Sequence, residues 1–423
     1  MIVVNRFVKF IRWLYPGLKV KRWISTVVVG LLLILASSPN LHNKDTLFWN
    51  IVSISVFFVG AIALIIGTFS LIKSILEVLY PHNHKDKGLI DIIFEQRLLA
   101  KGPRIVAIGG GTGLSTILEG LKEYSSNITA IVAMADEGGS SGRLREEFGI
   151  LPPGDVRNCL VSLSQSPKLM RDLFQYRFTE GGGIKGHSFG NLFITALTEV
   201  TGSFKAAVEE SSKVLAITGR VIPSSLDNVR LKAEYTDGTV KEGEDEIPNE
   251  EKSIKKITLL PADAKPNPEV FEAVKQADII IFGPGSLFTS IVPNLLMKDI
   301  CVAIAKRTDI LKLYICNVMT QPGETDGFTA ADHVEMLLNH INSTDVVNSC
   351  LINSGRLDYK LLFKYAQEGS FPVIFDRERL IKMGMRIFEA DVVSKSNYLR
   401  HDPEKTSREI VNAFNISKKV WKR

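Results

Sequence analysis

The sequence predicts an α/β protein with a parallel sheet, helices on both of its faces, a small antiparallel β insertion and an N-terminal pair of transmembrane helices. Three observations lead to this prediction. From residue 104 onward, apolar strand patterns alternate with helical patterns, which is typical of parallel sheets with right-handed crossovers. Residues 220–260 break the alternation with short strands and turn residues. Two uncharged apolar stretches lie in the first 80 residues, so we expect an anchor at 1–80, a linker at 81–103 and a body at 104–423.

The N-terminal region contains two candidate membrane-spanning helices. Residues 51–72 carry no charged side chain, and as a helix they extend about 33 Å, enough for a hydrocarbon core of about 30 Å. Residues 24–38 are also uncharged but shorter, and the loop 39–47 joins the two stretches. Because helices satisfy their own backbone hydrogen bonds in lipid, we expect a transmembrane hairpin. A cleaved signal peptide and a pair of buried core helices are the alternatives.

Charge is distributed unevenly along the chain. Residues 1–104 hold 13 of the 51 Lys and Arg residues and 5 of the 46 Asp and Glu residues, so the body is mildly acidic. That balance argues against a nucleic-acid partner, which needs clustered cations. Basic residues precede the first apolar stretch and follow the second, whereas the loop between them has only Lys44. By the positive-inside rule we expect a multi-pass protein of the cell inner (cytoplasmic) membrane, with the N-terminus and the body in the cytoplasm and the bilayer as a partner.

Composition restricts the class of the body. With 45% apolar and 23% charged residues, the chain is not of the disordered type. Its four cysteines never form a C-x-x-C pair, so they predict reduced core thiols and not a zinc site or a disulfide scaffold. These cysteines are Cys159, Cys301, Cys316 and Cys350.

The body begins with a strand, a glycine turn and a helix. The strand at 104–108 leads into Gly109, Gly110, Gly111, Thr112 and Gly113, and a helical pattern follows. Glycines let the backbone approach a phosphate, and the start of a helix offers free N–H groups and a positive dipole end. The spacing matches neither G-x-G-x-x-G nor a P-loop, so a tight turn without a ligand remains the alternative.

Acidic residues follow the next strand and open a later helix. Asp136 ends the strand at 128–135, where a dinucleotide fold places its ribose-binding acid, so an NAD site stays open. The same loop combines Ser140, Ser141 and Arg143, a mixture that suits a cation together with phosphates. Further along, Asp155 is either a helix N-cap or a second carboxylate that holds magnesium with Asp136. In the second case Arg157 and Asn158 would contact the same phosphates.

Three further glycine-rich or polar turns follow. His187 is a candidate base, phosphate donor or turn residue, and Asn191 on the next helical turn suits a base or ribose. Buried strands at 278–282 and 313–316 end in polar turns, and a further strand is expected at 346–352. Since the carboxyl ends of parallel strands share one edge, we expect a ligand cleft there. The candidates in these two turns are Gly283, Gly285, Ser286, Asn317, Thr320 and Gln321.

The β insertion and the C-terminus complete the plan. Residues 220–223, 229–235 and 254–260 predict an antiparallel meander, and the acidic loop 243–251 is expected to be solvated surface. A C-terminal helix is expected at 404–414.

Several motifs occur in an order that resembles one family. They are IGGGTGLS at 108–115, LPPGDVRNCL at 151–160, GHSFGNLFITALTE at 186–199, GPGSLFTSIVPNLL at 283–296 and NVMTQPGETDGFTAADH at 317–333. Together they are similar to the gluconeogenesis factor, CofD-like family, over residues 103–400. The N-terminal hairpin lies outside the usual family pattern. The resemblance implies a Rossmann-like body that binds nucleotides, UDP-sugars such as UDP-N-acetylglucosamine among them. It also implies links to gluconeogenic growth, cell shape and cell-wall precursor supply.

The resemblance also implies residue roles. The relative that names the superfamily is 2-phospho-L-lactate transferase, a magnesium-dependent enzyme of coenzyme F420 synthesis. The turn Gly109–Gly113 would match its phosphate loop, and Asp136 and Asp155 its metal-binding carboxylates. Asn191 and the turn 283–286 would match nucleotide contacts. Glu137 departs from the family pattern, because Asp or Asn is commoner there.

Three functions are compatible with these observations. The favoured one is a membrane-tethered regulator that binds a UDP-sugar without turnover. The second is a phosphotransferase in which Asp136 and Asp155 hold Mg²⁺ and act in catalysis, with GDP as a further candidate nucleotide. The third is an NAD-binding protein. A homo-oligomer is left open, and the downstream protein partner is not indicated.

Overall fold

The computed structural model describes residues 20–37, 47–79, 89–249, 252–394 and 398–421. The chain forms two compact units, residues 1–93 and 94–423, which are considered one at a time.

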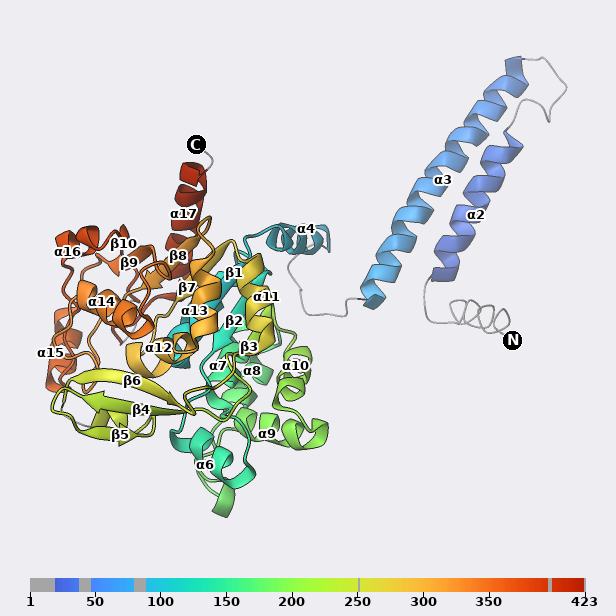
Figure 1. Ribbon diagram of the computed structural model, residues 1–423. Helices are drawn as coiled ribbons and strands as arrows, with labels where there is room; N and C mark the ends of the chain where they lie inside the picture. The colour runs from blue at the N-terminus through green and yellow to red at the C-terminus, as the bar shows by residue number, and fades with distance from the viewer. Residues whose placement is uncertain (1–19, 38–46, 80–88, 250–251, 395–397, 422–423) are drawn as a thin grey trace. The chain divides into compact units, whose positions relative to one another are not determined.

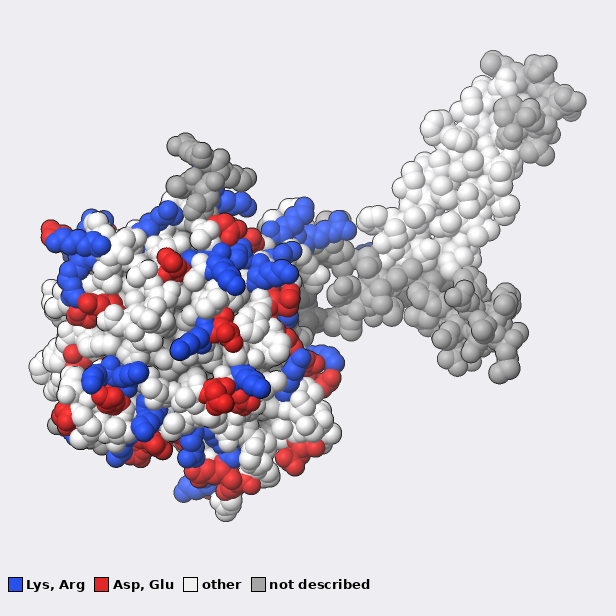
Figure 2. Space-filling model, viewed as in Figure 1, with Lys and Arg blue, Asp and Glu red and all other residues white. Residues whose placement is uncertain are grey.

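The N-terminal unit consists of two apolar helices packed side by side (Figure 1). These are α2 (Val20–Ala36) and α3 (Leu47–Leu79). At Gly60 a Cβ would lie 2.9 Å from the carbonyl oxygen of Gly30, so the two backbones touch through glycines. The outer surfaces expose large apolar side chains such as Leu32 and Phe58, and Figure 2 shows almost no charge on them. Helix α4 (Leu89–Ala100) follows in the expected linker.

The expected pair of membrane spans is found only in part. Among the described residues, one single helix, Phe48–Ser74, is long and apolar enough to cross a membrane. Helix α2 has an apolar segment at Arg22–Ala36 that falls short of the same length. Two short helices at 287–295 and 298–305 reach the length of a span only when they are counted together, and they belong to the hydrophobic core of the body. The multi-pass topology therefore lacks support from helix length, because 17 residues of α2 rise only about 26 Å.

The body is built on a seven-stranded sheet in which every neighbouring pair is parallel (Figure 1). The spatial order is β10-β9-β8-β7-β1-β2-β3. This confirms the predicted α/β class. The strands are β1 (Ile105–Gly109), β2 (Ile128–Val132), β3 (Arg220–Pro223), β7 (Ile279–Phe282), β8 (Leu311–Ile315), β9 (Ser349–Asn353) and β10 (Arg386–Ala390).

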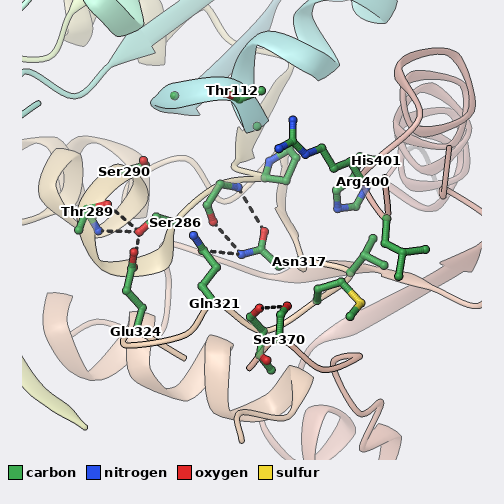
Figure 3. A pocket seen from close by; sticks show the side chains of 18 of the residues that line it. Thr112, Ser286, Thr289, Ser290, Asn317, Gln321, Glu324, Ser370, Arg400 and His401 are labelled. Carbon is green, nitrogen blue, oxygen red and sulfur yellow. Dashed lines mark hydrogen bonds between the residues drawn. The ribbon is translucent and has the colours of Figure 1, made fainter. Parts of the chain in front are cut away.

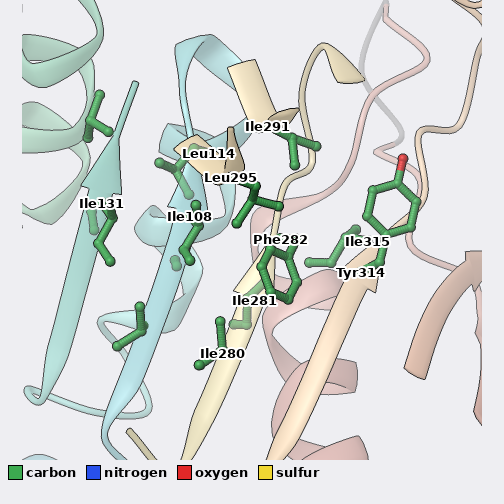
Figure 4. Close-up of a cluster of buried hydrophobic side chains, with 14 of the residues drawn as sticks. Ile108, Leu114, Ile131, Ile280, Ile281, Phe282, Ile291, Leu295, Tyr314 and Ile315 are labelled. Atoms are coloured by element: carbon green, nitrogen blue, oxygen red, sulfur yellow. The ribbon is translucent and has the colours of Figure 1, made fainter. Parts of the chain in front are cut away.

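Helices cover the sheet, and all residues of β1, β2, β7 and β8 are buried. Figure 4 shows Ile108, Ile131 and Phe282 from three of these strands close to Leu114 and Leu295 from the covering helices. The helices of the first half are α5 (Gly111–Leu121), α6 (Gly139–Phe148), α7 (Gly154–Leu163), α8 (Lys168–Gln175), α9 (Phe189–Thr201) and α10 (Phe204–Val214). Those of the second half are α11 (Pro268–Gln276), α12 (Val292–Leu295), α13 (Lys298–Ala305), α14 (Ala330–Ile341), α15 (Tyr359–Gln367), α16 (Arg377–Lys382) and α17 (Pro403–Trp421). The four cysteines are buried and free, as predicted.

The last helix packs on the first helix of the body. Helix α17 runs to Trp421, well beyond the expected end at residue 414, and it lies against α5. The contact is tight: a Cβ at Gly120 would lie 2.0 Å from the carbonyl oxygen of Pro403. The hydroxyl of Ser407 donates to the carbonyl of Ile117 at 3.2 Å. The two ends of the body are therefore joined.

The β insertion is smaller than predicted. Its three strands, β4 (Arg230–Tyr235), β5 (Val240–Glu242) and β6 (Ile254–Leu260), pair antiparallel in the order β5-β4-β6. Residues 220–223 do not belong to it. They form β3, which pairs parallel with β2 at the edge of the main sheet, because Val221, Ile222 and Pro223 are all buried there.

Candidate functional site

The order in which the chain adds strands to the sheet reverses at β1. From this central strand the chain moves through β2 to β3 on one side, and later fills the other side from β7 to β10. In open parallel sheets, ligands bind beyond the carboxyl ends of the strands at such a switch point. The turns after β1 and β7 therefore mark the expected place.

The turn after β1 is shaped by glycine. Helix α5 starts at Gly111, whose φ of +61° lies in the left-handed region that glycine adopts without strain. Gly110 at the N-cap position has no side chain to cap α5, and the carboxylate of Asp155 accepts a hydrogen bond from the backbone of Gly111 instead. A Cβ at Gly113 would lie 2.3 Å from the carbonyl oxygen of Pro284. The turns after β1 and β7 thus touch through their backbones.

The turn after β7 is held by side chains from the next loop. The Asn317 amide accepts a hydrogen bond from the N–H of Gly285 at 3.2 Å and donates to the carbonyl of Gly285 at 2.8 Å. Ser286 caps the following π-helical turn, Leu287–Ile291, by accepting from the N–H of Thr289 at 3.0 Å. Its hydroxyl donates to the carboxylate of Glu324, and burial raises the pKa of Glu324 to about 7.

A cavity of about 550 Å³ opens at this point (Figure 3). Its walls come from the turns after β1, β7 and β8, from the β insertion and from the C-terminal part of the body. The predicted residues that line it are Gly110, Gly111, Thr112, Gly113, Gly285, Ser286, Asn317, Thr320 and Gln321. These predicted residues come from three turns, those after β1, β7 and β8, and the three turns meet at one cavity.

The two predicted metal ligands lie together beside the glycine turn. A Cβ at Gly110 would lie 2.6 Å from Oδ2 of Asp155, and a Cβ at Gly154 would lie 2.8 Å from Oδ2 of Asp136. Asp155 is not an N-cap, because Pro153 occupies that position of α7. Burial and then the negative charge of Asp136 raise the pKa of Asp155 to about 7. Burial also raises the pKa of Asp136.

This carboxylate pair has the chemistry of a divalent cation site. A cation would relieve the mutual repulsion that raises the pKa of Asp155, and carboxylate oxygens are preferred ligands of Mg²⁺. In the described part of the chain, no three His, Cys, Asp or Glu side chains lie close enough to hold a metal by themselves. The pair therefore fits an ion that is completed by phosphate oxygens and water.

A third acid, Glu244, was missed by sequence reasoning. It belongs to the loop expected to be solvated surface, yet it lines the cavity. Its pKa is raised to about 8 by burial and by the charges of Asp136 and Asp155. Its backbone N–H donates to the carboxylate of Glu137 at 3.2 Å, and Glu137 also pairs with Arg230 at 2.8 Å. Glu137 therefore holds the β insertion against the site.

Another group of predicted residues lies next to Asp136, outside the cavity lining. The hydroxyl of Ser140 lies 3.0 Å from Nδ1 of His187 and accepts from the side-chain amide of Asn191 at 3.0 Å. All three are buried, and burial lowers the pKa of His187. Ser141 hydrogen-bonds Asp136. His187 is thus placed as a neutral member of a polar network.

The predicted arginines differ in their surroundings. Arg157 is buried, donates to the Ser188 hydroxyl and to Asn158 at 2.7 Å, and keeps its Nε without a partner among the described residues. Arg143 is exposed and donates to the carbonyl of Lys185 at 3.0 Å, so it supports the loop before His187. Gly109 and Gly283 shape the ends of β1 and the turn after β7 without lining the cavity.

Sequence reasoning also missed Glu324, Arg400 and His401, which line the cavity. Glu324 lies in the motif at 317–333, in the same polar loop as Asn317, and that shared loop was the available signal. Arg400 and His401 come from the loop before α17, where no glycine turn or strand end marked them. Only the folded chain brings that loop to β8.

The comparisons with known proteins agree with this architecture. The family model described as 2-phospho-L-lactate transferase CofD matches residues 105–393. The gluconeogenesis factor of Bacillus subtilis is 46% identical over 315 residues, covering 74% of this chain and 99% of the relative. A crystal structure of a Bacillus halodurans protein is 47% identical and has a TM-score of 0.71, covering 74% of this chain and 100% of that chain.

Relatives of two lengths are found. A relative from Clostridium acetobutylicum is 46% identical over 425 residues, which is 98% of this chain and 93% of the relative. A relative from Nostoc is 44% identical over 97% of this chain. The N-terminal region is therefore shared by some relatives, contrary to the expectation that it lies outside the family pattern.

Proposed function

Because this chain belongs to the CofD family and is similar to gluconeogenesis factors over most of its length, we propose that it binds a nucleoside-diphosphate-linked ligand. The favoured ligand class is a UDP-sugar, and the favoured role is regulation of carbon metabolism without turnover. Roles in cell shape and cell-wall precursor supply, expected from the resemblance, belong to the same proposal.

One observation carries the proposal: the cavity lies at the switch point of the sheet, against the glycine turn that begins α5. Free N–H groups and the positive end of a helix dipole favour a phosphate group. The cavity of about 550 Å³ is in the range of sites for small ligands. On the opposite wall, Oε1 of Gln321 accepts from the Asn317 amide at 3.3 Å, which leaves the N–H donors of Gln321 for a base or sugar.

A binding role is supported by the state of the polar groups in the cavity. The hydroxyl of Ser286 is committed to Glu324, and burial lowers the pKa of His401 to about 4. Both side chains are held by the protein's own contacts, Ser286 by Glu324 and His401 by the carbonyl of Cys316, which suits a preformed binding site.

The test is a titration of the purified protein with UDP-N-acetylglucosamine, UDP, GDP and NAD, combined with product analysis. Saturable binding of the UDP compounds with no product supports the proposal. If no UDP-linked compound binds at concentrations where NAD saturates, the NAD-binding alternative replaces it.

A magnesium-dependent phosphotransferase is the second candidate, and the carboxylate pair favours it. Asp136 and Asp155 would hold the ion, whose chemistry is to polarise a phosphoryl group and neutralise developing charge. Glu244, beside them, would add negative charge that strengthens cation binding. Release of a nucleoside monophosphate, lost in Asp155→Asn, would establish this activity, whereas unchanged release in that variant would eliminate the metal role.

Attachment to a membrane is a further part of the proposal. The segment Phe48–Ser74 has the length of a span, and most of its surface is exposed apolar side chains. We expect the full chain to remain with the lipid fraction after alkaline washing. Release into the soluble fraction would remove the anchor from the proposal and favour a processed signal sequence.

A further inference from the structure

A second cavity lies at the edge of the sheet opposite the candidate site. Its volume is about 390 Å³, and its walls come from the starts of β1, β2 and β3 and from the second half of α11. The candidate site lies beyond the carboxyl ends of the parallel strands, so this cavity belongs to their amino ends. The two cavities share no lining residue, and the second one therefore needs an explanation of its own.

Two arginines line this second cavity. Arg104 directly precedes β1, and Arg220 begins β3. Both are exposed, and neither forms an ion pair with any residue that the structure describes; Arg220 donates to the hydroxyl of Thr129 at 3.3 Å. Glu272 lines the same cavity, so the cations outnumber the acids there. Since guanidinium groups bind phosphate oxygens well, the cavity suits an anionic group.

The end of α4 is attached beside this cavity. Asn127, which lines it, donates its side-chain amide to the carbonyls of Ala100 and Gly102, each at 2.9 Å. The N–H of Ser126, another lining residue, donates to the carbonyl of Leu99 at 3.0 Å. The last turn of α4 and the cavity with its two arginines are therefore neighbouring parts of the body's surface.

Helix α4 carries an exposed apolar face and flanking cations. Phe94 and Leu98 are 67% and 60% exposed, and their spacing of four residues places them on one side of the helix. Arg97 and Lys101 are exposed as well, and Figure 2 shows blue side chains gathered on this segment. Apolar side chains next to Lys and Arg are typical of a helix that lies in the headgroup layer of an anionic membrane.

The position of α4 in the chain favours a lipid surface over other anionic partners. Helix α3 ends at Leu79 and α4 begins at Leu89, and the nine residues between them extend at most about 32 Å. Once α3 is inserted in a membrane, as proposed above, α4 stays within that reach of the end of α3. Tethering raises the effective concentration of lipid headgroups around α4 above that of any partner in free solution.

We propose that α4 and the arginine cavity form a docking surface for the phosphate headgroups of anionic lipids. Phe94 and Leu98 enter the boundary between headgroups and acyl chains, and Arg104 and Arg220 contact lipid phosphates. This inference rests on the proposed membrane attachment and is independent of the nucleotide ligand. It assigns a membrane-binding role to a segment that was expected to be only a linker.

The experiment uses the full-length protein in vesicles of phosphatidylcholine, with or without phosphatidylglycerol. Leu98→Cys carries a nitroxide label, which reacts selectively because the four native cysteines are buried. Relative accessibility to oxygen, which concentrates in lipid, and to a water-soluble nickel chelate gives the ratio of docked to undocked α4. We expect the label to enter lipid when phosphatidylglycerol is present.

Removing the two arginines should weaken this docking. Arg104→Ala combined with Arg220→Ala should lower the docked-to-undocked ratio about 25-fold, since each cation near an anionic surface contributes about fivefold. Arg104→Lys combined with Arg220→Lys keeps both charges and should retain docking. High salt should release α4 of the unsubstituted cavity, which tests the same charges without changing the fold.

Two controls address the opposite edge of the sheet. Arg356→Ala removes an exposed arginine from the loop after β9 and should leave docking unchanged. A label on Val240→Cys, an exposed apolar position in β5, should stay in water in both kinds of vesicle.

The contrary results separate docking from membrane attachment. A label at position 98 that stays in water, in vesicles that retain the protein after alkaline washing, overturns docking and leaves the attachment standing. Entry into lipid that is equal in both kinds of vesicle and insensitive to the arginine substitutions overturns the headgroup site. Protection that depends on protein concentration at constant lipid identifies a second copy as the occupant and also overturns it. Protein released by the wash overturns both proposals.

Discussion

Replacing Glu324 by Gln should stabilise the protein at alkaline pH. Glu324 is 6% exposed, and burial raises its pKa from 4.5 to about 7. The folded state therefore favours the protonated carboxyl, and ionisation opposes folding. As the pH rises from about 4.5 to about 7, the wild type loses folding free energy that Glu324→Gln does not lose. At about 1.4 kcal/mol per pH unit, the difference reaches about 3 kcal/mol and then stays constant.

The assay is urea unfolding of wild type and Glu324→Gln at pH 4, 6 and 8, followed by circular dichroism. We expect nearly equal free energies of unfolding at pH 4 and the full difference at pH 8. Glu368→Gln is the matched control, because Glu368 lines the same cavity but is exposed to solvent. A difference between wild type and Glu324→Gln that does not grow with pH would refute the reasoning.

Three further predictions concern other parts of the molecule. Gly113→Val places a Cβ 2.3 Å from the carbonyl oxygen of Pro284, so it should lower the free energy of unfolding by about 1 to 3 kcal/mol and weaken nucleotide binding. The control is Gly183→Val, which has open space around it and should change neither quantity. Urea unfolding and ligand titration measure the two effects. Asp155→Asn should abolish the dependence of nucleotide affinity on Mg²⁺, and titrations with equal Mg²⁺ dependence in both proteins would contradict the carboxylate site. Gly60→Leu should separate α3 from α2 and lower energy transfer between dyes on the two helices, while unchanged transfer would show that their glycine contact is dispensable.

The alternation of strands and helices was sufficient to predict the sheet and the edge at which the site lies. The glycine turns after β1 and β7 each follow a buried strand, and a parallel sheet leaves little choice about where such turns meet. These parts of the site depend on local pattern and on topology.

Other parts depend on tertiary contacts that no local pattern reveals. Residues 220–223 were expected to be the first strand of the antiparallel insertion, but parallel pairing with β2 decides their place. Glu244 stands in an acidic loop that is indistinguishable from solvated surface until Glu137 and Arg230 hold the insertion in place. Arg400 precedes the last helix, and its loop is brought to the cavity by the contact of His401 with the carbonyl of Cys316 and by the burial of Leu399.

The packing of α17 on α5 has a consequence for how the protein is made. The first helix of the body leaves the ribosome early, but the surface that it buries is supplied by the last segment to be translated. Until Pro403 and Ser407 have been synthesised, one face of α5, the helix that follows the glycine turn, has no packing partner. A nascent chain therefore completes the candidate site only at the end of synthesis. Removing α17 from the carboxyl terminus should destabilise α5 and the glycine turn before it, which lie near the start of the body.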